Sequence, residues 1–197
     1  QRPGRTRTVV IVLMAAIVVA ASLIAGALIL KSKTSGLGPN TSYTTPAAQQ
    51  NSLDGYTTGT GPGFSISFPT GWSRSENEQG VYWTAPAAKT LLQVGQTPWK
   101  VATAAEQATQ FDSEVTRNTA LFPHYVRLNL ATPLYRGATA GEVEFRYTDN
   151  QGRSCHAVDR FFKVNGKPYA IYFRSLEQDW ASFQTYRDQF YSSFKAA

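Results

Sequence analysis

The sequence predicts a single transmembrane helix followed by one α+β domain, in which two helices pack on a mainly antiparallel seven-stranded sheet. The first observation behind this prediction is an uncharged apolar run at residues 9–30. The second is the alternation of apolar and polar side chains in seven short segments, which is typical of strands. The third is the helical spacing of apolar residues in two longer segments, one between the strands and one near the C-terminus.

The apolar run at residues 9–30 contains 22 residues and no charged side chain. A helix of this length extends about 33 Å, enough to cross a hydrocarbon core of about 30 Å. The apolar part of a secretory signal peptide has about 7–15 residues, so we expect this longer run to stay in the protein. Position 27 is Ala27 where lipid attachment would need a cysteine, which excludes a lipid anchor. We therefore expect the chain to contact the lipid bilayer through residues 9–30.

The flanking charges predict the orientation of this span. Residues 1–8 form a basic juxtamembrane segment with three arginines, and two lysines follow the span. Because basic residues favour the cytoplasmic side, we expect a cytoplasmic N-terminus and an extracytoplasmic C-terminal domain at the cell membrane. Residues 31–62 are rich in Ser, Thr, Gly and Pro and predict a flexible linker, and residues 63–197 then form the domain.

The distribution of charge argues against a nucleic-acid partner. The whole chain has a net charge of +6, but residues 63–197 contain 14 basic and 12 acidic side chains, a net charge of +2. A small net charge without a run of basic residues is insufficient for a surface that follows a phosphate backbone. We therefore expect no nucleic-acid partner.

Three strands and a helix are predicted for the first half of the domain. Alternating apolar side chains in Phe64–Phe68 indicate a strand with one buried face. Aromatic and branched residues indicate two further strands at 81–85 and 91–97. The helix begins after Thr103-Ala104-Ala105-Glu106, which has the form of a capping box, and Pro123 ends it.

Four strands and a second helix are predicted for the second half. Asn165-Gly166 predicts a type I′ hairpin turn between the last two strands, because both central residues of that turn need positive φ. Aromatic residues from Trp180 to Phe194 recur at helical spacing and predict the C-terminal helix. The four strand segments are 125–130, 141–148, 154–164 and 168–174.

No segment predicts a catalytic or metal site, and we expect no cofactor. Cys155 is the single cysteine, and on a strand its neighbour His156 points to the opposite face, which works against a thiolate–imidazole pair. His124 and His156 are the only histidines, and the sequence places no acidic side chains that would complete a metal site with them. No serine lies in a G-x-S-x-G motif.

Six residues are candidates for a ligand or partner surface. Charged side chains alternate with aromatic ones in the later strands, where they either line a polar groove or form cross-strand ion pairs. Two tryptophans in predicted turns are candidates for stacking on a cell-wall carbohydrate, and core packing is the alternative. The six residues are Trp72, Trp99, Glu144, Arg146, Arg160 and Arg174.

Small residues within the span favour contact between two copies of it. Ala16 and Ala20, and likewise Ser22 and Gly26, have the spacing that lets two membrane helices approach closely. A homodimer through the span is therefore one expectation.

Three segments resemble the extracytoplasmic C-terminal regions of actinobacterial transmembrane serine/threonine protein kinases. They are LLQVGQTPW (Leu91–Trp99), YRG (Tyr135–Gly137) and the long run from Val143 to Trp180. In those proteins a kinase domain, a basic juxtamembrane stretch, one span, a spacer and such a domain follow in this order. The resemblance covers about residues 1–195. The element order is also similar to the PsbP class of α/β/α sandwiches, so the resemblance implies a PsbP-like fold.

The resemblance implies an extracytoplasmic sensor that binds a cell-wall ligand or an envelope protein and passes a signal to a kinase domain. Residues 1–197 lack the glycine-rich loop, the H-R-D segment and the D-F-G segment, so they do not transfer phosphate by themselves. A start at Gln1 fits a fragment of such a kinase and equally a trimmed or separate membrane protein.

Two other function classes stay open. One is a free-standing, single-pass accessory subunit tethered to the membrane in an envelope or respiratory complex. The other, a wall-active enzyme, has the least support because no catalytic motif is present.

Overall fold

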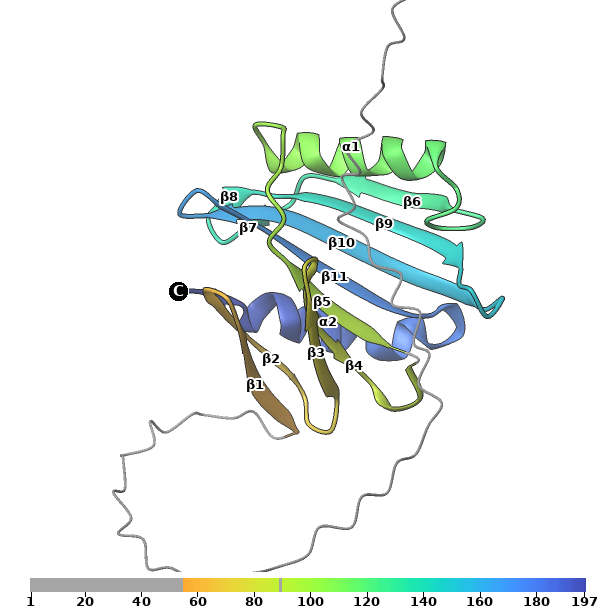
Figure 1. Cartoon of the computed structure of the whole chain (residues 1–197), viewed down its shortest axis with the longest axis horizontal. Coiled ribbons are helices and arrows are strands. Elements are labelled where there is room, and N and C mark those ends of the chain that lie inside the picture. Colours follow the sequence, from red (N-terminus) through yellow and green to blue (C-terminus); the bar gives the residue numbers. More distant parts are fainter. Residues whose placement is uncertain (1–54, 89) are drawn as a thin grey trace, which may run out of the picture.

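The computed structural model describes residues 55–88 and 90–197 (Figure 1). The predicted membrane span, residues 9–30, and most of the predicted linker lie outside these residues. Within the described part of the chain, no helix is both long and apolar enough to cross a membrane.

A seven-stranded sheet lies at the centre of the domain, and all of its neighbouring strands are antiparallel (Figure 1). Its longest hairpin turns at Asn165 and Gly166, whose φ angles are 51° and 77°, as the predicted type I′ turn requires. In spatial order the strands are β3 (Ser73–Asn77), β4 (Gly80–Thr84), β5 (Leu91–Gly95), β11 (Lys167–Leu176), β10 (Ser154–Val164), β9 (Gly141–Thr148) and β6 (Val126–Ala131).

Helix α1 (Ala104–Arg117) packs on one face of this sheet, over β9, β10 and β6 (Figure 1). The predicted capping box is confirmed: Thr103 Oγ1 accepts from the N–H of Glu106 at 3.1 Å, and the Glu106 carboxylate accepts from the N–H of Thr103 at 2.9 Å. Gly141 lets the helix approach the sheet, because a Cβ there would overlap the carbonyl oxygen of Ala104.

The opposite face of the sheet is covered by α2 (Trp180–Ser193) and by a small sheet of three strands. Trp83 is fully buried between them, with Phe64 and Phe68 at ring-centroid distances of 6.4 and 5.4 Å. The small sheet consists of β1 (Tyr56–Gly61), β2 (Phe64–Pro69) and β12 (Lys195–Ala196). Short elements complete the fold: η1 (Pro86–Ala88), η2 (Glu177–Asp179), β7 (Leu134–Tyr135) and β8 (Ala138–Thr139).

The predicted class, the mainly antiparallel sheet and the two helices are confirmed, but the membership of the sheets differs. Residues 64–68 belong to the small sheet, and β3 takes the predicted seventh place in the main sheet. All five residues of β3 are exposed and polar, so no apolar alternation marks this strand.

The folded region also begins earlier than predicted, because β1 lies within residues 31–62, the predicted linker. Its Thr- and Gly-rich sequence has no alternation of its own. Gly59 packs closely on aromatic rings: a Cβ there would lie 2.8 Å from the Phe68 ring and 2.7 Å from the Trp83 ring. The close approach of this glycine to its neighbours, and not an alternating pattern, therefore marks the strand.

The helices cover only part of each face of the main sheet. Helix α1 contacts β6, β9 and β10, while the segment from Thr97 to Thr103 leads from the end of β5 across the same face to the start of α1, with Trp99 packed on Phe161 of β10 (Figure 1). A small pocket opens on this face beside the segment, at a place that α1 does not cover.

Candidate functional site

The six residues predicted as a ligand or partner surface do not form one site. Arg174 on β11 lies on the α1 face, where its Nη1 is 3.6 Å from the sulfur of Cys155. Glu144, Arg146 and Arg160 lie on the α2 face of β9 and β10. The predicted set is therefore divided between the two sides of the sheet.

The two tryptophans of the set have different surroundings. Trp72 packs against Tyr186 and Phe190 of α2, with ring centroids 6.0 and 5.8 Å apart, so core packing accounts for it. Trp99 packs edge-on against Phe161 at 6.2 Å, and Nζ of Lys163 lies 5.3 Å from its ring centroid. Trp99 also lines a small pocket on the α1 face of the sheet.

Arg160 is held by a cross-strand ion pair and by aromatic rings. Its Nε donates to a carboxylate oxygen of Glu142 at 2.6 Å. Its guanidinium lies 3.7 Å from the centroid of the Tyr191 ring and 5.1 Å from that of Tyr135. These contacts occupy both the charge and the flat face of Arg160. Of the two alternatives for Arg160, a polar groove or a cross-strand ion pair, the structure shows the ion pair. This pair lies beneath α2 and not on a solvated face of the sheet.

Glu144 and Arg146 belong to a second cluster, which surrounds His156. The imidazole stacks on Trp180 with ring centroids 3.8 Å apart, and its Nε2 lies 2.9 Å from Glu144 Oε1. Its Nδ1 lies 3.0 Å from Glu177 Oε2, but neither atom has a partner in hydrogen-bond geometry. No group of three His, Cys, Asp or Glu side chains among the described residues could hold a metal ion.

Cys155 has the surroundings of a core residue and not of a nucleophile. The side chain is buried, and this burial raises the pKa of its thiol. His156 lies on the opposite face, as strand alternation predicts, so the two side chains do not form a catalytic pair.

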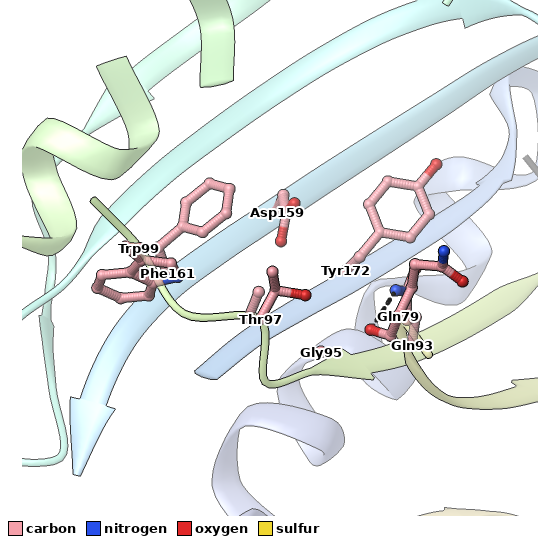
Figure 2. A pocket seen from close by; sticks show the side chains of 9 residues that line it. Gln79, Gln93, Gly95, Thr97, Trp99, Asp159, Phe161 and Tyr172 are labelled. Carbon is pink, nitrogen blue, oxygen red and sulfur yellow. Dashed lines mark hydrogen bonds between the residues drawn. The ribbon is translucent and has the colours of Figure 1, made fainter. Parts of the chain in front are cut away.

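A small pocket opens on the α1 face of the sheet, beside the segment that leads from β5 to α1 (Figure 2). Its free volume is about 20 Å³, which is room for one water-sized group. Asp159 of β10, which is 4% exposed, is the acidic residue of the lining. Its other polar and aromatic lining residues are Gln79, Gln93, Thr97, Trp99, Phe161 and Tyr172.

The carboxyl group of Asp159 is strongly perturbed. Burial disfavours its charged form, and the negative charge of Glu142 adds to this effect, so its pKa rises from 3.8 to about 8. Its Oδ1 is buried and has no hydrogen-bond partner among the described residues. Leaving a buried acceptor unsatisfied costs about 1–3 kcal/mol, so a donor that enters the pocket would relieve this cost.

The other polar groups around Asp159 are partly engaged. Gln93 donates from Nε2 to the carbonyl oxygen of Gln79 at 3.4 Å (Figure 2). The hydroxyl of Tyr172 lies 3.2 Å from that of Tyr147, and burial raises the pKa of Tyr172 well above its ordinary value. The pocket thus offers one unsatisfied acid beside aromatic walls. This arrangement suits the binding of a small donor group, and it contains no nucleophile–base pair.

The six predicted residues do not include Asp159, although a signal for it exists. Alternation in β10 places this carboxyl on the same side as Ala157 and Phe161, which is the apolar face of the strand. An acidic residue at an apolar position of a buried strand is the pattern that indicates such a site.

Comparison with known proteins identifies the family of this chain and solved structures that share its fold. Residues 58–196 match a family described as the serine/threonine kinase C-terminal domain. No curated protein matches the chain.

Several solved structures are similar. The solution structure of cyanobacterial PsbP (CyanoP) from Synechocystis sp. is 17% identical, with a TM-score of 0.58 over 77% of this chain and 98% of that chain. A crystal structure from Bacteroides thetaiotaomicron is 10% identical, with a TM-score of 0.52 over 74% of this chain and 49% of that chain. LpqN of Mycobacterium tuberculosis, described as involved in cell envelope biogenesis, is 13% identical, with a TM-score of 0.47 over 71% of this chain and 89% of that chain. The similarity to cyanobacterial PsbP shows a PsbP-like fold and, at this identity, nothing about function.

Proposed function

Because the chain belongs to the serine/threonine kinase C-terminal domain family, we propose that it is the membrane-anchored extracytoplasmic binding region of a receptor-type serine/threonine kinase. In this proposal residues 9–30 cross the cell membrane, and the folded domain binds a small ligand or an envelope protein outside it. The family match and the charges that flank the apolar run support this arrangement.

The observation that carries the binding role is the unpartnered carboxyl of Asp159 at an open pocket. A ligand that inserts an ammonium or hydroxyl group would donate a hydrogen bond to Oδ1. The pocket has room for one such group, so the rest of the ligand would lie across Thr97 and Trp99 at the surface. An ammonium group would pair with the ionised carboxylate, which gains population as the pH rises toward 8.

Titration with methylammonium tests this role. The full chain is held in detergent micelles, and the indole N–H resonance of Trp99 is followed at pH 6, 7 and 8. We expect a saturable shift whose apparent affinity increases with pH, and we expect Asp159→Asn to abolish it. Tetramethylammonium carries the same charge but no N–H donor and is the matched control. Equal responses to the two cations, or an unchanged response in the variant, would contradict the binding role.

A membrane-tethered accessory subunit is the second candidate, and the exposed apolar side chains of β6 favour it. Purification of the tagged native protein in mild detergent distinguishes the two. A polypeptide that contains this chain and autophosphorylates supports the receptor kinase. Other subunits in stoichiometric amounts, without kinase activity, support the accessory role.

A further inference from the structure

Arg174 of β11 carries a positive charge that no acidic side chain balances among the described residues. It forms no ion pair in that part of the chain. A guanidinium has five N–H donors, and sulfur is a weak acceptor. The hydrogen bond from Nη1 of Arg174 to the sulfur of Cys155, at 3.6 Å, is its one bond to a described residue. Most of the donor capacity of Arg174 therefore remains for a ligand.

Two tyrosine hydroxyls lie near this guanidinium on the α1 face of the sheet. Tyr147 of β9 is paired with Cys155 of β10, and its hydroxyl oxygen lies 3.2 Å from that of Tyr172. Because one O–H of this pair donates to the other oxygen, the second O–H is left for another acceptor. Burial raises the pKa of Tyr147 to about 12 and that of Tyr172 well above its ordinary value. Both hydroxyls therefore keep their protons at neutral pH.

We propose that Arg174, with the hydroxyls of Tyr147 and Tyr172, binds a carboxylate group of a ligand. The guanidinium would donate two parallel N–H bonds to the two carboxylate oxygens. The free tyrosine O–H would donate to one of the same oxygens. Arg174 is half-buried, so its side chain is open to a ligand. Tyr147 and Cys155 are 7 and 0% exposed and form the buried side of this site.

The charges around Arg174 favour a ligand group with one negative charge. Arg153 is used by Asp149: its Nε donates to Asp149 Oδ2 at 2.8 Å, and its Nη2 lies 2.7 Å from the same oxygen. This oxygen lies 3.8 Å from the sulfur of Cys155, so a paired carboxylate already borders the site. Arg174 is left as one uncompensated positive charge. A carboxylate matches this charge, whereas a phosphate monoester carries close to two negative charges.

The carboxylate site is additional to the proposed donor-binding role of Asp159 and does not depend on it. Asp159 is paired with Tyr172 across β10 and β11, and Arg174 follows two residues later on the same strand face. The ring of Tyr172 lines the Asp159 pocket, while its hydroxyl belongs to the Arg174 site. The two sites take groups of opposite charge, so each can be tested with its own probe.

Titration with acetate tests the site. The full chain is held in detergent micelles at pH 7, and the resonances of Tyr147 and Tyr172 are followed after ¹³C labelling of tyrosine at Cζ. Acetate replaces chloride at constant ionic strength, which cancels general screening. We expect a saturable shift of both resonances. A shift that does not saturate, or that affects neither tyrosine, would overturn the proposal.

Methyl phosphate distinguishes a carboxylate from the other common oxyanion. We expect it to bind at least about tenfold more weakly than acetate under the same conditions, because the site supplies one positive charge beside Asp149. Methyl phosphate that binds as tightly as acetate would overturn the assignment to a carboxylate.

Variants of two arginines test the role of the guanidinium. Arg174→Lys keeps the charge but loses the fork of N–H donors, and we expect the dissociation constant of acetate to rise at least about tenfold. Arg117→Lys is the matched control, since Arg117 is exposed and also forms no ion pair with a described residue. It should leave the constant unchanged. Equal constants in the two variants would overturn the proposal.

A third variant tests the hydroxyls without changing the charge. Tyr147→Phe retains the ring, which packs on Phe122 at a centroid distance of 4.7 Å, and removes one O–H donor. We expect the dissociation constant of acetate, followed at Tyr172, to rise about three- to tenfold. An unchanged constant would overturn the part assigned to the hydroxyls.

Two cross-checks separate this site from the Asp159 pocket. Asp159→Asn should leave the acetate response intact, and Arg174→Lys should leave the methylammonium response of Trp99 intact. Failure of either proposal is then visible without the other. If Asp159→Asn weakened acetate binding as much as Arg174→Lys does, the assignment of the carboxylate to Arg174 would be overturned.

Discussion

Asp159→Asn should make the domain more stable at neutral pH. In the folded protein the pKa of Asp159 is about 8, whereas the unfolded chain returns it to about its ordinary value of 3.8. The folded protein therefore retains a proton that the unfolded chain has lost between these two pH values. The stability linked to this proton is fully present below about pH 4 and is lost progressively as the pH rises through about 8. Asparagine has the same shape and does not titrate.

The size of the effect follows from the difference between the two pKa values. Each pH unit between them changes the free energy of unfolding by about 1.4 kcal/mol. The gain from Asp159→Asn should therefore approach zero near pH 4, reach about 1–2 kcal/mol at pH 5 and rise to at most about 4 kcal/mol at pH 7.

Urea unfolding of residues 55–197 at pH 4, 5, 6 and 7 measures this effect, since the hydrophobic cores lie within these residues. Subtracting the wild-type value from that of the variant at each pH cancels the titration of other groups. Asp188→Asn, at a side chain that is 67% exposed, is the control and should change stability by less than about 0.5 kcal/mol. A stability difference that does not vary with pH, or a variant that is less stable than the wild type at pH 7, would contradict a raised pKa of Asp159 in the folded protein.

Three other substitutions test the packing. Thr103→Ala removes the capping box and should cost about 1 kcal/mol in urea unfolding, with Thr103→Ser retaining most of the stability; equal losses would contradict the capping role. Gly141→Ala should lower the free energy of unfolding by about 1–3 kcal/mol, because the new methyl group meets the backbone of Ala104. An unchanged midpoint of thermal unfolding would show that α1 is not packed this closely. Trp83→Ala should cost about 3–5 kcal/mol, and a small loss would mean that its site collapses around the cavity.

Strands with one buried face were predictable because alternation follows directly from burial. The hairpin of β10 and β11 is the clearest case, since its turn sequence also demands a particular φ. Alternation does not say which strands pair, however. Residues 64–68 therefore appear as a strand in the sequence without revealing that they leave the main sheet, and β3, which is exposed on both sides, gives no signal.

The candidate site was less predictable, because the role of a charged side chain depends on its neighbours. Arg160 and Glu144 are charged residues next to aromatic ones, as in a polar groove, yet each side chain is engaged by a contact within the fold. Asp159 differs from them because its buried Oδ1 has no hydrogen-bond partner among the described residues. Burial on a given strand face can be inferred from alternation, but the lack of a partner becomes visible once the surrounding chains are placed.

Labelling of intact cells tests the proposal that the domain lies outside the cell membrane. A full-length Ser75→Cys variant places one accessible thiol on exposed β3, while the native Cys155 is buried. Thr6→Cys, on the other side of the predicted span, is the control. We predict that a membrane-impermeant maleimide modifies Ser75→Cys in intact cells. It should modify Thr6→Cys only after the cells are lysed. If Ser75→Cys were modified only after lysis, the placement of the domain outside the membrane would be wrong.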